Sequence, residues 1–117
     1  MSMTFSYLGN RYKSLDLTLS PGTTDYSVCA NNPDTFPDWN ENWDERDYWT
    51  ICVIKNLRSE GFNVELDVKF HDTSYDSITI SKDDVPAIFE PFVFRDVFIT
   101  NLDSDYSVSF DITFFNN

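Results

Sequence analysis

The sequence predicts an all-β protein, an antiparallel β-sandwich or jelly-roll-like fold of about eight strands. Apolar and polar residues alternate with a period of two along much of the chain, while no segment sustains the 3.6-residue period of an amphipathic helix. A segment of the chain also occurs twice. Aromatic residues make up 17% of the sequence and include eleven Phe, which supplies a large buried area from few positions. A length of 117 residues predicts one domain, spanning 1–117.

The repeated segment is found at Ile54–Phe70 and again, one residue shorter, at Ile99–Phe114. Omitting Gly61 aligns Asn56 with Asn101, Leu57 with Leu102, Ser59 with Ser104, Val64 with Val108, Asp67 with Asp111 and Phe70 with Phe114. Two copies are too few to stack as a solenoid. We therefore expect a hairpin-like unit that occurs twice in a pseudo-symmetric sandwich or barrel.

The first strands are expected before residue 31. A short one is predicted at Thr4–Leu8, and the alternation of Leu with polar residues predicts another at Leu15–Leu19. Ser20–Thr23 follows, with Pro and Gly in the positions that a type II turn prefers. The next strand should hold Tyr26 and Val28 on one face.

Each copy of the repeat should contain one half-buried alternating strand. The expected inward faces are Phe62, Val64, Leu66, Val68 and Phe70 in the first copy, and Tyr106, Val108, Phe110, Ile112 and Phe114 in the second. Before these strands lie the more continuously apolar segments Tyr48–Ile54 and Phe92–Ile99, which favour central strands that are buried on both faces or contact a partner. A short strand at Ser77–Ser81 and one helical turn within Asp83–Phe89 complete the prediction.

The charge of the chain restricts its partners. Twenty Asp and Glu oppose eight Lys and Arg, which gives a net charge of −12 and a pI near 4.1. Such a surface repels phosphates and anionic lipids, so we expect no direct nucleic-acid or membrane contact, and favour a basic partner or a cation. The N-terminal residues lack the features of a secretory signal peptide, which predicts synthesis in a host cytoplasm.

The longest irregular segment, residues 31–47, is acidic and aromatic, and its length suggests a function. Its candidate binding residues are Phe36, Asp38, Trp39, Trp43, Asp44 and Asp47. Trp rings can stack on sugars while Asp and Asn bind hydroxyl groups, so one interpretation is a glycan site. Others are a protein contact, a plug at the end of the sandwich, or a solvated acidic loop held by Trp39 and Trp43.

The same loop contains a candidate cation site. Alternating carboxylate and amide side chains resemble the oxygen ligands of a calcium loop, and they are Asp38, Asn40, Asn42 and Asp44. The pattern departs from an EF-hand, because Trp43 stands where a sharp turn needs Gly and Trp49 where a bidentate Glu is expected. The alternatives are a Ca²⁺ site of another kind or no cation site.

Catalytic residues are hard to find in the sequence, so we expect a non-enzyme. His71 is the only histidine and is expected at the surface beside Asp72. Cys52 lies in an apolar run and is expected in the core, with Cys29 and Cys52 as separate thiols. The three glycines form no phosphate-binding loop.

The segment from Ile80 to Phe114 resembles small β-sandwich virion proteins of tailed bacteriophages. It has a polar connection, an apolar strand with an Arg, a turn with Asn and Asp, and an alternating last strand. The resemblance covers about 35 of 117 residues. It implies a head, neck or tail accessory protein of the virion, whose partners are other virion proteins or further copies of itself. It supplies no binding residue.

Two other functions remain open on sequence grounds. One is a glycan- or host-surface-binding module, based on the aromatic acidic loop. The other is an anti-defence protein that mimics nucleic acid, because Glu65 and Asp67 on one strand face would lie about 7 Å apart, although Lys69 is mixed with them. We expect a non-enzymatic structural protein first, with these two as alternatives.

Overall fold

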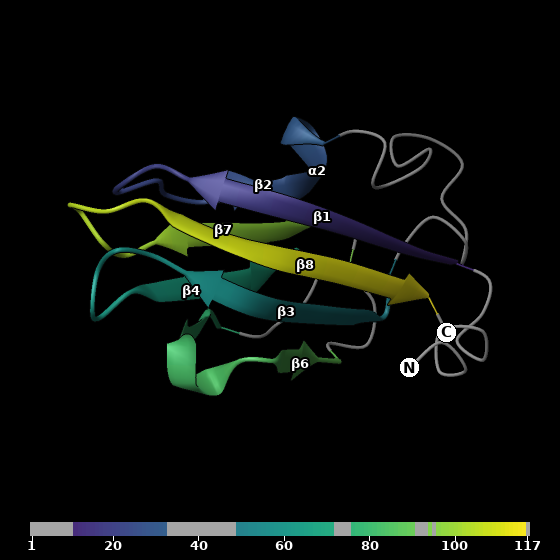
Figure 1. Ribbon diagram of the computed structural model, residues 1–117. Coiled ribbons are helices and arrows are strands. Elements are labelled where there is room, and N and C mark those ends of the chain that lie inside the picture. Colours follow the sequence, from purple (N-terminus) through teal and green to yellow (C-terminus); the bar gives the residue numbers. More distant parts are fainter. Residues whose placement is uncertain (1–10, 33–48, 72–75, 91–93, 95, 117) are drawn as a thin grey trace.

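The computed structural model describes residues 11–32, 49–71, 76–90, 94 and 96–116, which form two antiparallel four-stranded sheets packed face to face (Figure 1). The first sheet has the order β1 (Arg11–Leu19), β8 (Val108–Asn116), β3 (Ile51–Arg58), β6 (Ala87–Phe89). The second has the order β2 (Tyr26–Ser27), β7 (Val97–Asn101), β4 (Glu65–Phe70), β5 (Ile78–Ser81). The predicted all-β sandwich is therefore confirmed.

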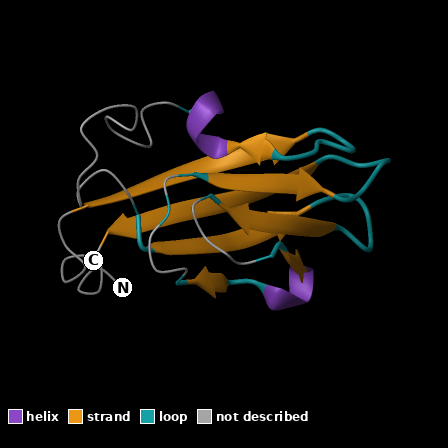
Figure 2. Cartoon of the chain, turned by 180° about the vertical axis from the view of Figure 1, so that it is seen from behind, coloured by secondary structure: helices purple, strands orange, loops and turns teal. Residues whose placement is uncertain are grey.

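The strand pairing is that of a jelly roll. The first strand pairs with the eighth, the second with the seventh, the third with the sixth and the fourth with the fifth. This arrangement corresponds to one long antiparallel ribbon that is rolled into two sheets. Figure 2 shows the same two layers from behind, with the two short helical segments at opposite edges of the sandwich.

The strands also obey an internal two-fold relation. Each strand of the first sheet can be replaced by the strand four places further along the chain, with the count continuing from β8 to β1. The result, β5-β4-β7-β2, is the strand order of the second sheet read from its other edge. The registers agree as well. Ile54 lies opposite Ile112 in the first sheet, and the residues aligned with them, Ile99 and Val68, lie opposite each other in the second. The sequence repeat is thus one part of a pseudo-symmetric arrangement that relates β1–β4 to β5–β8.

The two strands of each repeat copy do not form a hairpin. β3 and β4 belong to different sheets, and so do β7 and β8, so each copy is a corner that carries the chain from one sheet to the other. A corner lets the two strands of one copy face the same core from opposite sheets. As a result, every strand pair joins a strand from β1–β4 to one from β5–β8.

The core lies between the sheets and follows the predicted alternation. Its largest fully buried side chains are Trp49, Phe94, Phe110, Phe114, Leu19, Ile54, Leu66, Ile99, Ile112, Val28 and Val64. Phe62 and Tyr106 were expected on the inward faces, but they are 96% and 44% exposed. The expectation fails because β4 begins only at Glu65 and β8 at Val108, so both aromatic residues lie in corner loops.

Other sequence expectations need smaller corrections. β2 ends at Ser27, and Val28 begins a single helical turn, α2 (Val28–Asn31), because the Ser27 hydroxyl caps it by accepting from the N–H of Ala30. β3 and β7 are central strands as predicted, yet outer residues such as Ile51 are only half-buried. The helical turn near residue 83 is a 3₁₀ turn, η3 (Lys82–Asp84), which is followed by β6.

The predicted type II turn is supported by the bond from Thr23 N–H to Ser20 C=O and by the positive φ of Gly22. The strand predicted at Ser77–Ser81 is present as β5. The strand predicted at Thr4–Leu8 lies outside the described residues.

A buried carboxylate connects α2 to the second sheet. Asp96 is 2% exposed. One of its oxygens accepts from the backbone N–H groups of Cys29, at 2.9 Å, and of Val97, at 2.7 Å. The other accepts from the Ser27 hydroxyl. Asp96 thereby supplies a partner for an N–H of α2 that has none within the helix.

A buried amide connects two loops, the β1–β2 turn and the β7–β8 corner, at the opposite end of the second sheet. Asn101 is 1% exposed, and its NH₂ group lies 3.1 Å from the carbonyl oxygen of Ser20 and 3.0 Å from that of Tyr106. Its side-chain oxygen accepts from the N–H of Asp103 at 3.0 Å. The repeat-related Asn56 is exposed, has a positive φ and bonds only Asp111 through its side chain.

The two asparagines therefore predict different effects of substitution. Asn101→Ala should lower the free energy of unfolding by about 2–4 kcal/mol, because buried backbone groups lose their partners. Asn56→Gly should change it by less than about 1 kcal/mol, because glycine adopts a positive φ freely and the lost bond is exposed. Urea unfolding of the two variants compares them directly, and equal losses would contradict the role given to Asn101.

Candidate functional site

The binding residues predicted from sequence lie outside the described part of the chain. They are Phe36, Asp38, Trp39, Asn40, Asn42, Trp43, Asp44 and Asp47, all within residues 33–48. The glycan site and the Ca²⁺ site proposed for that loop stay predictions. Among the residues that are described, no three His, Cys, Asp or Glu side chains form a group that could hold a metal ion. No helix in the described segments is long and apolar enough to cross a membrane.

Cys52 is a core residue, as the sequence predicted, and Cys29 is buried too, although it lies in α2 and not in the strand expected for it. Cys29 and Cys52 are buried and neither forms a disulfide. Burial raises the pKa of the Cys52 thiol, so the nucleophilic thiolate form is suppressed in the folded protein. His71 is exposed at the end of β4, with its ring near that of Phe98.

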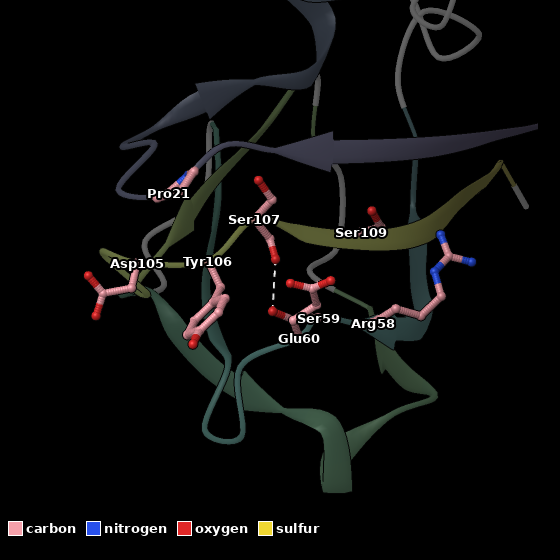
Figure 3. Close-up of a pocket in the computed structure, with 8 residues that line it drawn as sticks. All are labelled: Pro21, Arg58, Ser59, Glu60, Asp105, Tyr106, Ser107 and Ser109. Atoms are coloured by element: carbon pink, nitrogen blue, oxygen red, sulfur yellow. Dashed lines mark hydrogen bonds between the residues drawn. The ribbon is translucent and has the colours of Figure 1, made fainter.

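The described residues form a groove at the end of the sandwich where the corners lie (Figure 3). We call it the corner groove. Its volume is about 630 Å³, and it is open to solvent. The residues that line it are Pro21, Arg58, Ser59, Glu60, Asp105, Tyr106, Ser107 and Ser109.

The fold builds this groove from segments that are distant in sequence. The β3–β4 and β7–β8 corners and the β1–β2 turn meet at one end of the molecule, at the left in Figure 1. The Ser59 hydroxyl donates to the carbonyl oxygen of Ser107 at 2.8 Å and so joins the two corners (Figure 3). The Lys82 ammonium donates to the carbonyl oxygens of Ser59 and Gly61 and fixes the first corner to η3.

Tyr106 is held in place from two directions. Its N–H donates to the carboxylate of Asp103, which also accepts from the N–H of Asp105. Its carbonyl oxygen accepts from Asn101. The ring lies against Gly61, where an added Cβ would be 3.0 Å from Tyr106 Cδ2 and 2.8 Å from Asp103 Oδ2. The inserted glycine of the first repeat copy therefore makes room for the second corner.

The charged groups of the groove differ in their partners. Arg58 forms an ion pair with Asp16, at 2.9 Å, between half-exposed and exposed side chains. The carboxylates of Glu60 and Asp105 make no hydrogen bond or ion pair with other residues in the described part of the chain. The groove thus presents two unpaired anions beside one cation that already has a partner.

Exposed apolar side chains also occur on the two corners. Phe62 follows Glu60 by two residues and is 96% exposed, while Leu102 on the second corner is 46% exposed. Tyr106 adds an aromatic wall at 44% exposure. Single exposed apolar side chains are common on protein surfaces, and aromatic ones on loops with a fixed backbone are suited to contact another molecule.

Sequence reasoning missed this site, although two signals were present. Phe62 and Tyr106 each stand at the first position of an alternating run, where a strand may not yet have begun. Gly61 is the one residue without a counterpart in the other repeat copy. The meeting of the two corners with Pro21 depends on the packing of the sheets and could not be read from these signals.

The chemistry of the corner groove suits binding. It combines an aromatic ring, two carboxylates, a guanidinium and several hydroxyl groups, without a histidine or a thiol. No protein-family model, curated protein sequence or solved structure matches this chain. The interpretation of the groove therefore rests on its own geometry.

Gly61→Ala tests the tight contact of the two corners. We expect a loss of about 1–3 kcal/mol in the free energy of unfolding, because the new methyl group must displace Asp103 or Tyr106. Ser107→Ala is the control, since its side chain lines the groove without a close approach of this kind, and it should change stability by less than about 0.5 kcal/mol. Chemical denaturation measures both, and an unchanged Gly61→Ala variant would contradict the contact.

Thiol labelling tests the burial of the cysteines. In the folded protein neither Cys29 nor Cys52 should react with an aromatic disulfide reagent on the timescale of minutes, whereas both should react at once in denaturant. Fast reaction of either thiol under native conditions would contradict the core position described above.

Proposed function

We propose that this chain is a non-enzymatic assembly protein of a bacteriophage virion, a head, neck or tail accessory component that acts through protein contacts. Two observations support the proposal. The jelly roll is an architecture that viral capsid proteins use, among others. The segment Ile80–Phe114 resembles small virion proteins of tailed phages. Because a fold alone does not determine function, the surface must carry the argument further.

The observation that carries the proposal is the exposure of Phe62 on a fixed loop. Its side chain is 96% exposed, while the flanking backbone is held by Lys82 and by the bond from Ser59 to Ser107. A large apolar side chain on a preorganised loop loses little conformational entropy when a partner covers it. Such side chains are the usual anchors of protein interfaces.

A second candidate function is glycan binding in the corner groove. The exposed ring of Tyr106 offers a flat platform, and the carboxylates of Glu60 and Asp105 can accept hydrogen bonds from sugar hydroxyl groups. Lectins are also found among jelly rolls. We place it second because it leaves the exposure of Phe62 unexplained.

Nucleic-acid mimicry receives less support from the described surface. On the outer face of the second sheet Glu65 and Asp67 are followed by Lys69, and on the first sheet Asp111 lies opposite Lys55. Carboxylates are therefore mixed with cations on both outer faces, whereas a mimic should present continuous rows of anions.

Mass spectrometry of gradient-purified phage particles tests the proposed function. Peptides of this chain should be present at a copy number that matches a symmetry of the capsid, neck or tail. Presence in infected cells together with absence from particles would refute the virion role and favour a host-directed function.

Substitution of Phe62 tests whether this side chain anchors the protein in the particle. Phe62→Ser should fold with unchanged thermal stability, because the side chain is exposed, yet it should be depleted from particles by at least about tenfold. Ile88→Ser is the matched control, since Ile88 is 64% exposed on the edge strand β6, away from the corners. Equal incorporation of the two variants would show that Phe62 is not an anchor.

A further inference from the structure

We propose that the corner groove binds an arginine side chain of a basic protein segment. The inference rests on the proposed function and specifies the partner, since it names the chemistry that the docking end of this chain recognises. The occupant is a basic segment of a partner protein whose arginine guanidinium enters the groove.

The aromatic wall is the first reason. The ring of Tyr106 is exposed on the groove side and is held by Asn101 and Asp103 through its backbone. A guanidinium is planar and weakly hydrated, and it stacks on such a ring more readily than a primary ammonium does. No residue in the described ranges hydrogen-bonds the phenol hydroxyl, so the ring and not the hydroxyl is the feature that the fold positions.

The carboxylates are the second reason. Glu60 comes from the first corner and Asp105 from the second, and both line the groove beside Tyr106 (Figure 3). Neither is paired with a cation among the described residues. A guanidinium offers several N–H donors in one plane, so it can meet carboxylates while its face lies on an aromatic ring.

The cations already present complete the electrostatic argument. Arg58 is paired with Asp16, and the Lys82 ammonium bonds two backbone carbonyl oxygens of the first corner. The contacts of both cations go to Asp16 and to backbone carbonyl oxygens, and neither cation contacts Glu60 or Asp105 among the described residues. On a chain of net charge −12, this leaves the groove complementary to a cationic partner.

The experiment uses the full chain and a capped peptide of alternating glycine and arginine, with the lysine peptide of equal length as comparison. Binding is measured by titration calorimetry at low salt and at about 0.15 M salt. The arginine peptide should bind at least about threefold more tightly than the lysine peptide. Affinity for both should fall with salt.

Charge-matched variants separate the contribution of the groove to binding from the contribution of the net charge. The double variant Glu60→Gln with Asp105→Asn should weaken arginine-peptide binding by about five- to twentyfold. Glu90→Gln with Asp76→Asn removes the same charge from exposed positions outside the groove, and should leave affinity within about twofold. Equal losses in the two doubles would overturn the inference, because they would show a response to net charge alone.

Variants of the ring test the stacking directly. Tyr106→Phe keeps the aromatic face and should bind as the parent does, whereas Tyr106→Leu should weaken binding by about two- to fivefold. Each variant is first checked for an unchanged unfolding midpoint in urea, so that loss of binding is not loss of fold. If Tyr106→Leu binds normally and the lysine peptide binds as tightly as the arginine peptide, the groove does not recognise a guanidinium.

The two proposals can fail separately. If the chain is present in particles but peptide binding ignores the groove variants, the virion role stands and the arginine site is wrong. If the groove selects arginine but the chain is absent from particles, the site stands and the virion role is wrong.

Discussion

The structure depends on the pairing of β3 with β8 and of β4 with β7. These pairs place the corner strands of one repeat copy against those of the other, and their inward residues form the centre of the core. Because the registers of the two pairs correspond, a single pattern of alternating apolar residues satisfies both sheets at once. Two of the buried polar residues, Asp96 and Asn101, then connect the loops at opposite ends of β7. The corner groove exists because these pairs bring both corners to the same end.

The sequence predicted the parts of this fold that local periodicity encodes. Val64, Leu66 and Val68 alternate with polar residues and are buried, because a strand with one face on a core permits little else. The repeat correctly predicted pseudo-symmetry. It did not reveal that each copy crosses between sheets, since a hairpin and a corner require the same alternation. Val28 was assigned to a strand because a cap by Ser27, completed by Asp96 from a distant strand, has no local signature.

The candidate site was less predictable than the fold, for a physical reason. Attention fell on residues 31–47 because tryptophans and acids are concentrated there in the sequence. The corner groove instead collects Pro21, Glu60 and Tyr106 from three separate segments, and only strand pairing makes them neighbours. Phe62 looked like a core residue because it continues a period of two by one position. Its exposure follows from the later start of β4, which the glycine before it permits.

The two-fold arrangement has a consequence for synthesis of the chain. Among the described strands, none of β1 to β4 pairs with another of these four, so they leave the ribosome before any of their β-sheet partners. The first pairing that can form, between β4 and β5, must wait for Ile78–Ser81, and the last strand is required to close the first sheet. Folding is therefore dominated by contacts between distant residues, which form slowly. The excess of acidic residues then has a second effect. Charge repulsion opposes association between the unpaired first halves of neighbouring nascent chains.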